Sequence, residues 1–346
     1  MSLAGEPAAA EAAATSSRIP RRSAAARRRS RRRSAARKYA TVILLLSPWI
    51  IGFVVFTLGP MILSAWWAFC HYDMVGSPKW IGLDNFRFMF GLGHIEGMAP
   101  GAQDPYYWLS VRNTLWIIVL GVPLRIVFGM LTAMLLTRPK RGVNAYRTLF
   151  FMPSMVPRVA AALVFVYLLN PATGPINRII EALGFNAPLW FFDPQWAKPA
   201  LLIMGLWGIG DAIVIYLAGL LNVPRDLYEA IAIEGASWWQ RFRHVTLPMI
   251  TPVIFFTLIM GIIDGFQYFD QAYVAGNVAS GQAMELGRPE GSLLFYGLWL
   301  YTKAFRSFQL GYASAMAWVL FLATMACTVV LLVTSKRWVH YGGKIQ

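Results

Sequence analysis

The stretch EAIAIEGASWWQRFRHVTLPMITPVIFFTLIMGIIDGF occupies residues 229–266 and joins two kinds of segment. Its second part, from Leu247 onward, is almost entirely apolar. A helix rises ~1.5 Å per residue, so ~20 apolar residues cross the ~30 Å hydrocarbon layer of a membrane. Its first part is polar with interspersed aromatic side chains. The stretch therefore predicts a membrane-spanning helix preceded by a polar element beside the membrane.

The composition of the whole chain agrees with this prediction. Of 346 residues, 57% are hydrophobic and 14% are charged, and the mean hydropathy is +0.51. Soluble globular chains have roughly 25% charged and 45–50% apolar residues, so the composition argues against a soluble enzyme and a disordered protein. The two cysteines, Cys70 and Cys327, lie far apart and have no metal-ligand spacing, although a single disulfide between them stays open.

Apolar segments of sufficient length recur along the chain and predict an all-α integral membrane protein with six transmembrane helices. The six segments are 39–69, 108–136, 149–169, 196–221, 247–274 and 311–334. They are too long for the strands of a membrane barrel. A seventh apolar stretch, 293–301, spans only ~14 Å as a helix, which indicates an interfacial or re-entrant segment.

The distribution of Lys and Arg predicts the orientation. Residues 18–38 contain eleven basic residues and no acidic one, and a basic segment before the first apolar run keeps that end in the cytoplasm. Both termini are then cytoplasmic (N-in/C-in). Residues 1–38, which contain very few large apolar side chains, are expected to be a disordered basic tail, and residues 39–340 are expected to form the transmembrane domain. A nucleic-acid-binding role for the tail is the less favoured alternative.

The loop between the fourth and fifth predicted helices, residues 224–248, contains signals for a short helix–turn–helix on the cytoplasmic side. Pro224 and Asp226 form a helix start signal, and Gly235 is suited to the turn. Trp238 and Phe242 then offer a second apolar face. Such an element is too small to be a domain, so we expect it to be a docking surface for a partner. The alternative is an amphipathic helix lying on lipid.

This loop resembles the cytoplasmic signature of ABC importer permeases, which reads EAA, three residues, Gly, nine residues and Ile-x-Leu-Pro. Glu229, Ala230, Gly235, Leu247 and Pro248 match at the required spacing, whereas an Ile and a Val replace the third Ala and the later Ile. In that family the loop is a coupling helix that sits in a cleft of the cytoplasmic ATPase. The resemblance implies an ATPase-coupling role for Glu229, Ala230, Glu234, Gly235, Trp238, Leu247 and Pro248.

Over residues 39–340 the chain is similar to the carbohydrate-uptake permeases of the maltose-transporter type. The similarity rests on RNTL at 112–115, FMPSMVP at 151–157, GPIN at 174–177 and GYASA at 311–315. It implies the membrane subunit of a bacterial, binding-protein-dependent sugar importer in the cytoplasmic membrane. The implied partners are a second homologous permease, two copies of a cytoplasmic ATPase and an extracytoplasmic substrate-binding protein.

The chain contains no Gly-x-x-x-x-Gly-Lys-Ser/Thr loop for cradling phosphate. We therefore expect no enzyme activity, cofactor or metal in this chain, with ATP and Mg bound by the separate ATPase. A membrane-embedded transferase would need clustered acidic or His side chains, but His71, His94, His244 and His340 are scattered. A membrane anchor with a nucleic-acid- or lipid-binding arm is the other alternative.

Ionisable residues within spans are costly and usually face a partner or a cavity. Arg125, Arg158, Asp211 and Asp264 lie well inside four of the predicted spans. Counted from the cytoplasmic ends of their helices, Asp211 and both arginines lie at a similar depth, which predicts an ion pair between Asp211 and one of them. Asp264 lies ~8–10 Å farther along its helix, beyond the reach of an arginine, so it is expected to be unpaired and to face the translocation cavity.

Sugars require planar hydrogen-bonding groups and aromatic faces. Two helix faces offer them, and in the resembled family the two helices beside the coupling loop contact the sugar. The candidate site comprises Trp207, Gly208, Asp211, Gly261, Asp264, Gly265, Tyr268 and Gln271. The glycines are equally well explained as helix-packing positions. Since one permease of a pair suffices to hold the sugar, this chain could hold none. A polyol or glycerol-phosphate substrate remains an alternative.

Overall fold

The computed structural model describes residues 24–92, 102–138, 141–280 and 287–340, with side chains for residues 39–92, 102–138, 141–277 and 287–340. The chain divides into two compact units, Met1–Leu63 and Ser64–Gln346. Because the two units are separate, each is described by itself.

The first unit consists of helix α2 (Ala24–Phe53), the π-helical turn η1 (Val54–Leu58) and the start of α3 (Gly59–Trp67). Helix α2 begins well before the predicted span, because Ala and Arg, which dominate residues 24–38, are both strong helix formers. The structure therefore differs from the predicted disordered tail over residues 24–38. The remainder of that prediction, residues 1–23, lies outside the described residues.

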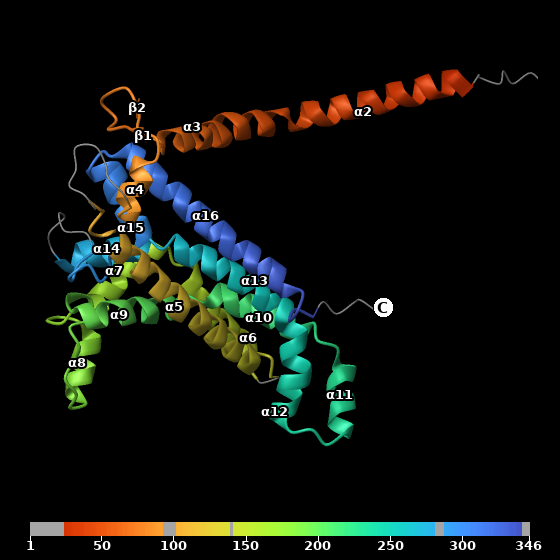
Figure 1. Ribbon diagram of the computed structural model, residues 1–346. Helices are drawn as coiled ribbons and strands as arrows, with labels where there is room; N and C mark the ends of the chain where they lie inside the picture. Colours follow the sequence, from red (N-terminus) through yellow and green to blue (C-terminus); the bar gives the residue numbers. More distant parts are fainter. Residues whose placement is uncertain (1–23, 93–101, 139–140, 281–286, 341–346) are drawn as a thin grey trace, which may run out of the picture. The chain divides into compact units, whose positions relative to one another are not determined.

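The second unit is almost entirely helical (Figure 1). After α3 its elements are β1 (Cys70–His71), β2 (Lys79–Trp80), α4 (Asp84–Phe90), α5 (Tyr107–Leu136), α6 (Val143–Phe151), η2 (Met152–Met155), α7 (Arg158–Leu168), α8 (Pro175–Ala182), η3 (Trp190–Phe192), α9 (Pro194–Trp207), α10 (Gly210–Leu221), α11 (Arg225–Ile233), α12 (Trp238–Arg241), η4 (Phe242–Thr246), α13 (Leu247–Phe266), α14 (Asp270–Ser280), α15 (Tyr296–Tyr301), η5 (Thr302–Arg306) and α16 (Leu310–Ser335). The strands β1 and β2 pair antiparallel with Cys70 opposite Trp80.

Helices α5, α10 and α13 form the centre of this unit, and each of them contacts the other two (Figure 1). Their buried side chains include Ala133, Tyr216 and Ile250, none of which is accessible to solvent. Helix α16 packs along α13, and the short α15 packs against α5 and α16. The core thus fixes the three helices that carry the ionisable residues Arg125, Asp211 and Asp264.

Among the described residues, four helical segments are long and apolar enough to cross a membrane: Tyr39–Trp67, Tyr107–Leu136, Trp238–Phe266 and Leu310–Ser335. Two further candidates are bent pairs, Val143–Met155 with Arg158–Leu168 and Pro194–Trp207 with Gly210–Leu221. The all-α class is confirmed, and four to six spans agree with the six predicted segments.

The first bend has a local cause, and the second lies at a tightly packed glycine. Val156 adopts an extended conformation, with ψ of 128°, because it precedes Pro157, and the proline ring disfavours helical geometry there. The resulting angle between the two helices is 98°. The second bend, of 49°, precedes Gly210. A Cβ at Gly210 would lie 2.7 Å from the carbonyl oxygen of Phe150, so this position accepts only glycine without a rearrangement.

The fifth predicted span is shorter than expected. Helix α13 ends at Phe266, with Gln267 at its C-cap, and α14 begins at Asp270. The prediction that residues 247–274 form one helix is therefore wrong, because the chain breaks its helical hydrogen bonding after Phe266. Tyr268 and Gln271 consequently lie beyond the end of α13.

Candidate functional site

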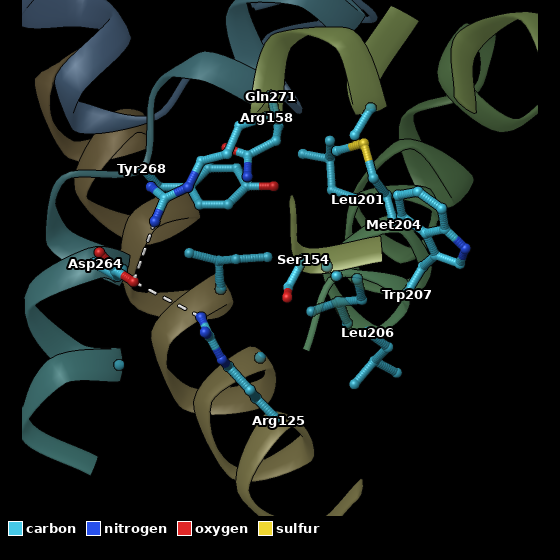
Figure 2. A pocket seen from close by; sticks show the side chains of 18 of the residues that line it. Arg125, Ser154, Arg158, Leu201, Met204, Leu206, Trp207, Asp264, Tyr268 and Gln271 are labelled. Atoms are coloured by element: carbon cyan, nitrogen blue, oxygen red, sulfur yellow. Dashed lines mark hydrogen bonds and ion pairs between the residues drawn. The ribbon is translucent and has the colours of Figure 1, made fainter. Parts of the chain in front are cut away.

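A cavity of about 260 Å³ lies among α5, α9, α10 and α13, beside the bend before α7 (Figure 2). All eight residues of the predicted sugar site line it: Trp207, Gly208, Asp211, Gly261, Asp264, Gly265, Tyr268 and Gln271. The shared helix face predicted for the α13 residues does not hold for Tyr268 and Gln271, since both follow the end of α13. The turn at residues 267–269 nevertheless leaves them beside the same cavity.

The cavity has chemically different walls (Figure 2). Leu201, Met204 and Trp207 of α9 form an apolar wall, and the Trp207 ring packs edge-on against Phe165 with 5.5 Å between ring centroids. The other wall contains charged and hydroxyl groups. An aromatic face opposite hydrogen-bonding groups is the arrangement expected for a ligand with both CH surfaces and hydroxyl groups.

A chain of ion pairs crosses the polar wall. Arg125 Nη2 lies 2.7 Å from Asp211 Oδ2, and Arg125 Nη1 lies 3.7 Å from Asp264 Oδ2. Arg158 Nη2 lies 3.5 Å from the same Asp264 oxygen. The predicted ion pair of Asp211 is thus present, with Arg125 as its partner.

The prediction that Asp264 is unpaired is wrong, because this carboxylate contacts both arginines. The predicted separation assumed straight helices of equal tilt, with depth counted from each cytoplasmic end. The chain bends by 98° immediately before Arg158, so that count does not apply to it. The other half of the prediction, that Asp264 faces a cavity, agrees with its place in the cavity wall.

Tyr268 provides a further polar group. Its ring packs against Phe295, and its hydroxyl is buried without a hydrogen-bond partner in the described part of the chain. Buried hydroxyls nearly always have a partner, so an unmatched one at a cavity wall is available to a ligand or to water. Ser154 also lines the cavity, and its hydroxyl donates to the carbonyl of Phe151.

The glycines serve as helix-packing positions as well as cavity lining. A Cβ at Gly261 would lie 2.9 Å from Val122 Cγ1, and one at Gly265 would lie 2.6 Å from Ile118 Cγ1. Both glycines therefore let α13 approach α5 closely. Gly208 is less constrained, because a Cβ there would meet only the carbonyl oxygen of Gly205 at 3.9 Å.

Sequence reasoning treated Arg125 and Arg158 only as possible structural partners and missed them as cavity residues. Both line the cavity, and 34% of the Arg125 side chain and 58% of the Arg158 side chain are exposed. The available signal was their position, since an ionisable residue within a predicted span commonly faces a cavity. The apolar wall of α9 could not be found in this way, because its residues resemble any other apolar helix surface.

The polar element of residues 224–248 forms a second exposed site. Helices α11 and α12 lie side by side at one end of the unit (Figure 1). Gly235 has φ of +74°, in the left-handed region that favours glycine, and it makes the turn between them. The predicted helix–turn–helix is therefore confirmed as a structure. A hydrogen bond of 3.0 Å between the hydroxyls of Tyr228 and Thr246 ties α11 to η4.

Most of the predicted coupling residues are exposed on this element. Glu229, Ala230, Glu234, Gly235 and Trp238 are exposed, whereas Leu247 and Pro248 are half-buried where α13 begins. The Trp238 ring stacks on Phe242 with 5.9 Å between centroids. Ser237 and Gln240 form a capping box that fixes the start of α12. The element thus presents a preformed surface with exposed aromatic and acidic side chains.

No group of three or more metal-ligating side chains occurs within the described ranges. The chemistry available in the cavity is therefore hydrogen bonding, ion pairing and aromatic contact. These interactions bind and orient a solute, and the cavity offers no cluster of ligands for a metal ion.

Residues 125–341 match the sequence family described as binding-protein-dependent transport system inner membrane component. The probable ABC transporter permease protein YesP of Bacillus subtilis (strain 168) is 39% identical over 300 residues, which cover 86% of this chain and 91% of that protein. The lactose transport system permease protein LacF of Rhizobium radiobacter is 34% identical, over 64% of this chain and 73% of that protein.

A solved structure of a bacterial ABC transporter involved in the import of the acidic polysaccharide alginate has a similar fold. One of its chains superposes with a TM-score of 0.73 at 22% sequence identity, covering 88% of this chain and 98% of that one. At this identity the similarity concerns the fold.

Proposed function

Because the chain belongs to the family of binding-protein-dependent transport system inner membrane components, we propose that it forms half of the translocation pathway of an ATP-driven sugar importer. The family places it in the membrane as a multi-pass protein, in agreement with its apolar helices. The function is that of an ABC transporter permease, which binds and passes a solute.

The observation that carries the sugar assignment is the cavity with one apolar, aromatic wall and one charged wall. A sugar ring has CH groups that pack on an aromatic face and hydroxyls that both donate and accept hydrogen bonds. Asp211 and Asp264 can accept from such hydroxyls, and Arg125 and Arg158 can donate to them. The two arginines and the two aspartates carry equal and opposite charge, which suits a neutral polyhydroxylated ligand.

The names of related proteins support the same class of substrate. LacF is named as a lactose permease, SmoG of Agrobacterium fabrum as a sulfoquinovosyl glycerol permease and MalF of Thermococcus litoralis as a trehalose/maltose permease. UgpA of Yersinia enterocolitica is named as an sn-glycerol-3-phosphate permease. The two guanidinium groups in the cavity make this phosphate ester the second candidate.

The complete transporter would contain this chain, a second homologous permease, two copies of a cytoplasmic ATPase that binds ATP and Mg, and an extracytoplasmic substrate-binding protein. We propose six spans, counting each bent pair as one, and the excess of Lys and Arg in the segments assigned to the cytoplasm supports placing both termini on that side. In this orientation α11 and α12 face the cytoplasm and are available to the ATPase.

The coupling role of α11 and α12 can be tested at Gly235. A Gly235→Asp change adds a side chain and a charge at an exposed left-handed turn, where a Cβ would meet nothing within 4 Å of its own chain. Gly184 provides a matched control, since it also has a positive φ and an open surrounding. We expect Gly235→Asp to abolish co-purification of the ATPase and Gly184→Asp to preserve it. Equal retention of the ATPase by both variants would contradict the coupling role.

The sugar site can be tested in proteoliposomes containing the full transporter. Uptake of maltose, lactose and sn-glycerol 3-phosphate would be compared between Trp207→Ala and Trp196→Ala, because both residues lie on α9 and only Trp207 lines the cavity. Loss of the cavity tryptophan should lower uptake about tenfold, which corresponds to ~1.4 kcal/mol of lost binding. If no sugar is transported, or if the two variants behave alike, the sugar site is wrong. Transport of the phosphate ester alone would favour the second candidate.

A further inference from the structure

A second cavity, of about 190 Å³, lies beside the first one. Its lining residues come from α5, α10 and α13, which also line the first cavity. On α13 the larger cavity contacts Gly265, whereas the smaller one contacts Thr257 and Met260, nearer the start of the helix. On α5 the larger cavity contacts Ile117, and the smaller one contacts Ile126. Because α5 and α13 both pass from one cavity to the other, the two cavities lie in succession along them.

The boundary between the cavities is charged. Five residues line both cavities: Val122, Arg125, Asp211, Gly261 and Asp264. Among them, Val122 and Gly261 bring α5 and α13 together, since even a Cβ at Gly261 would lie 2.9 Å from Val122 Cγ1. The remaining three are the members of the ion-pair bridge centred on Arg125.

We propose that Arg125 is a movable ionic barrier between two successive compartments of the translocation pathway, and that it selects for polyhydroxylated solutes. This inference rests on the permease function proposed above. The guanidinium spans from Asp211 on α10 to Asp264 on α13, among the residues that line both cavities, so in this proposal a solute passing from one cavity to the other separates these contacts.

The two halves of the bridge differ in a way that indicates how it opens. The contact with Asp211 is a short hydrogen bond of 2.7 Å, whereas that with Asp264 is 3.7 Å. Asp264 also retains Arg158 at 3.5 Å. Arg125 can therefore leave Asp264 and stay with Asp211 without creating an unpaired carboxylate, which would be strongly unfavourable.

The chemistry of the barrier also selects the solute. When the ion pair between Arg125 and Asp264 separates, sugar hydroxyls can accept from the guanidinium and donate to the carboxylate, whereas an apolar solute cannot. On the far side of the bridge, the smaller cavity is lined by the half-buried Thr257, whose hydroxyl is hydrogen-bonded to that of the buried Tyr216. A polyhydroxylated solute thus finds hydrogen-bonding groups on both sides of Arg125.

The barrier can be tested with introduced cysteines in the assembled transporter. Ser154 lines only the larger cavity and Met260 only the smaller one. Ser154→Cys and Met260→Cys would be treated with a membrane-impermeant thiol reagent in sealed vesicles of each orientation, with labelling of the native cysteines subtracted. We expect that, from either side, the reagent reaches at most one of the two positions. Labelling of both positions from the same side would overturn the proposal.

A charge-balanced variant tests the role of Arg125 itself. Arg125→Met combined with Asp211→Asn removes one charge of each sign and leaves Asp264 paired with Arg158. In this background we expect both positions to become accessible from one side, with labelling about tenfold faster, equivalent to a barrier lower by ~1.4 kcal/mol. Unchanged separation of the two positions would overturn the proposal.

Two further variants keep the result interpretable. Asp264→Asn weakens the long contact with Arg125, together with the contact to Arg158, and leaves the pair of Arg125 and Asp211 in place. It should increase labelling in the same direction, even if the double variant does not assemble. Arg87→Met with Asp84→Asn removes an ion pair of 2.9 Å whose members line neither cavity, and it should leave the labelling unchanged. Failure of the unaltered complex to assemble with an ATPase would contradict the permease function, whereas failure of the labelling pattern in an assembled complex contradicts only the barrier.

Discussion

The close approach of α13 to α5 predicts a sharp difference between two glycines of the same cavity. In a Gly265→Ala variant the new Cβ would lie 2.6 Å from Ile118 Cγ1, about 1 Å inside an ordinary van der Waals contact. Ile118 is only 9% exposed, and its Cγ1 is held close to the α5 backbone. The side chain cannot move away easily, so the helices must separate or the rotamer must change.

Overpacking of this kind costs typically ~1–3 kcal/mol. The same substitution also raises helix propensity by up to ~1 kcal/mol, which partly conceals the clash. Gly205→Ala supplies the control, because Gly205 is also helical, lines the same cavity and has nothing within 4 Å of a new Cβ. Both variants gain the same helix propensity. The difference between their free energies of unfolding therefore reports the clash alone, which we expect to cost ~1–3 kcal/mol.

The assay is thermal unfolding of the purified transporter, followed by tryptophan fluorescence. We expect a lower midpoint for Gly265→Ala than for Gly205→Ala. Ile118→Ala alone should destabilise by ~2–5 kcal/mol through a cavity. Combined with Gly265→Ala it should be less harmful than the sum, because the added methyl occupies the space that Ile118 leaves. Equal midpoints for the two alanine variants, or strict additivity in the double variant, would refute the packing argument.

Three further predictions concern other parts of the chain. Asp104 is 1% exposed and accepts hydrogen bonds of 2.7 Å from both Trp299 Nε1 and the Tyr312 hydroxyl. Asp104→Asn should therefore lower the stability of the protein by ~1–3 kcal/mol in the same unfolding assay, whereas Asp73→Asn on the surface should not. Ser237→Ala removes the capping box of α12 and should cost ~1 kcal/mol locally, seen as faster amide hydrogen exchange at residues 238–242 with no change in α11. Burial raises the pKa of the Cys70 thiol, so Cys70 should resist a maleimide at about pH 8 in the folded protein and react after unfolding; reaction in the folded protein would contradict its burial.

The sequence was sufficient for the properties that depend on composition and length. Apolar segments long enough to cross a membrane predicted the helical class, and Gly235 between Asp226 and Trp238 predicted the turn between α11 and α12. These signals are local, so they do not depend on how the helices pack. The eight predicted cavity residues were found from two signals: ionisable side chains within a span seldom face lipid, and the family resemblance pointed to the two helices beside the coupling loop.

The sequence was insufficient where the path of the backbone decides the result. Length alone did not reveal that α13 ends at Phe266, because the residues that follow are also mostly apolar. The apolar wall of α9 carries no chemical signal either, as Leu201 and Met204 would be equally suitable for a lipid-facing or a core position. Both features depend on contacts between segments that are distant in the chain.

The pairing of Asp264 illustrates how a helix break changes the electrostatic argument. Arg158 and Asp211 each lie in the first turn of a helix that follows a bend, α7 and α10 respectively. A helix N-terminus favours a carboxylate and disfavours a cation. Asp211 is therefore stabilised at its position, whereas Arg158 requires compensation from elsewhere, and Asp264 on α13 provides it at 3.5 Å. Had the bends been assigned first, from Pro157 and from the glycines before Asp211, the unfavourable position of Arg158 would have called for a carboxylate partner. Asp264 is the carboxylate deep within a predicted span for which the sequence offered no partner at the same depth.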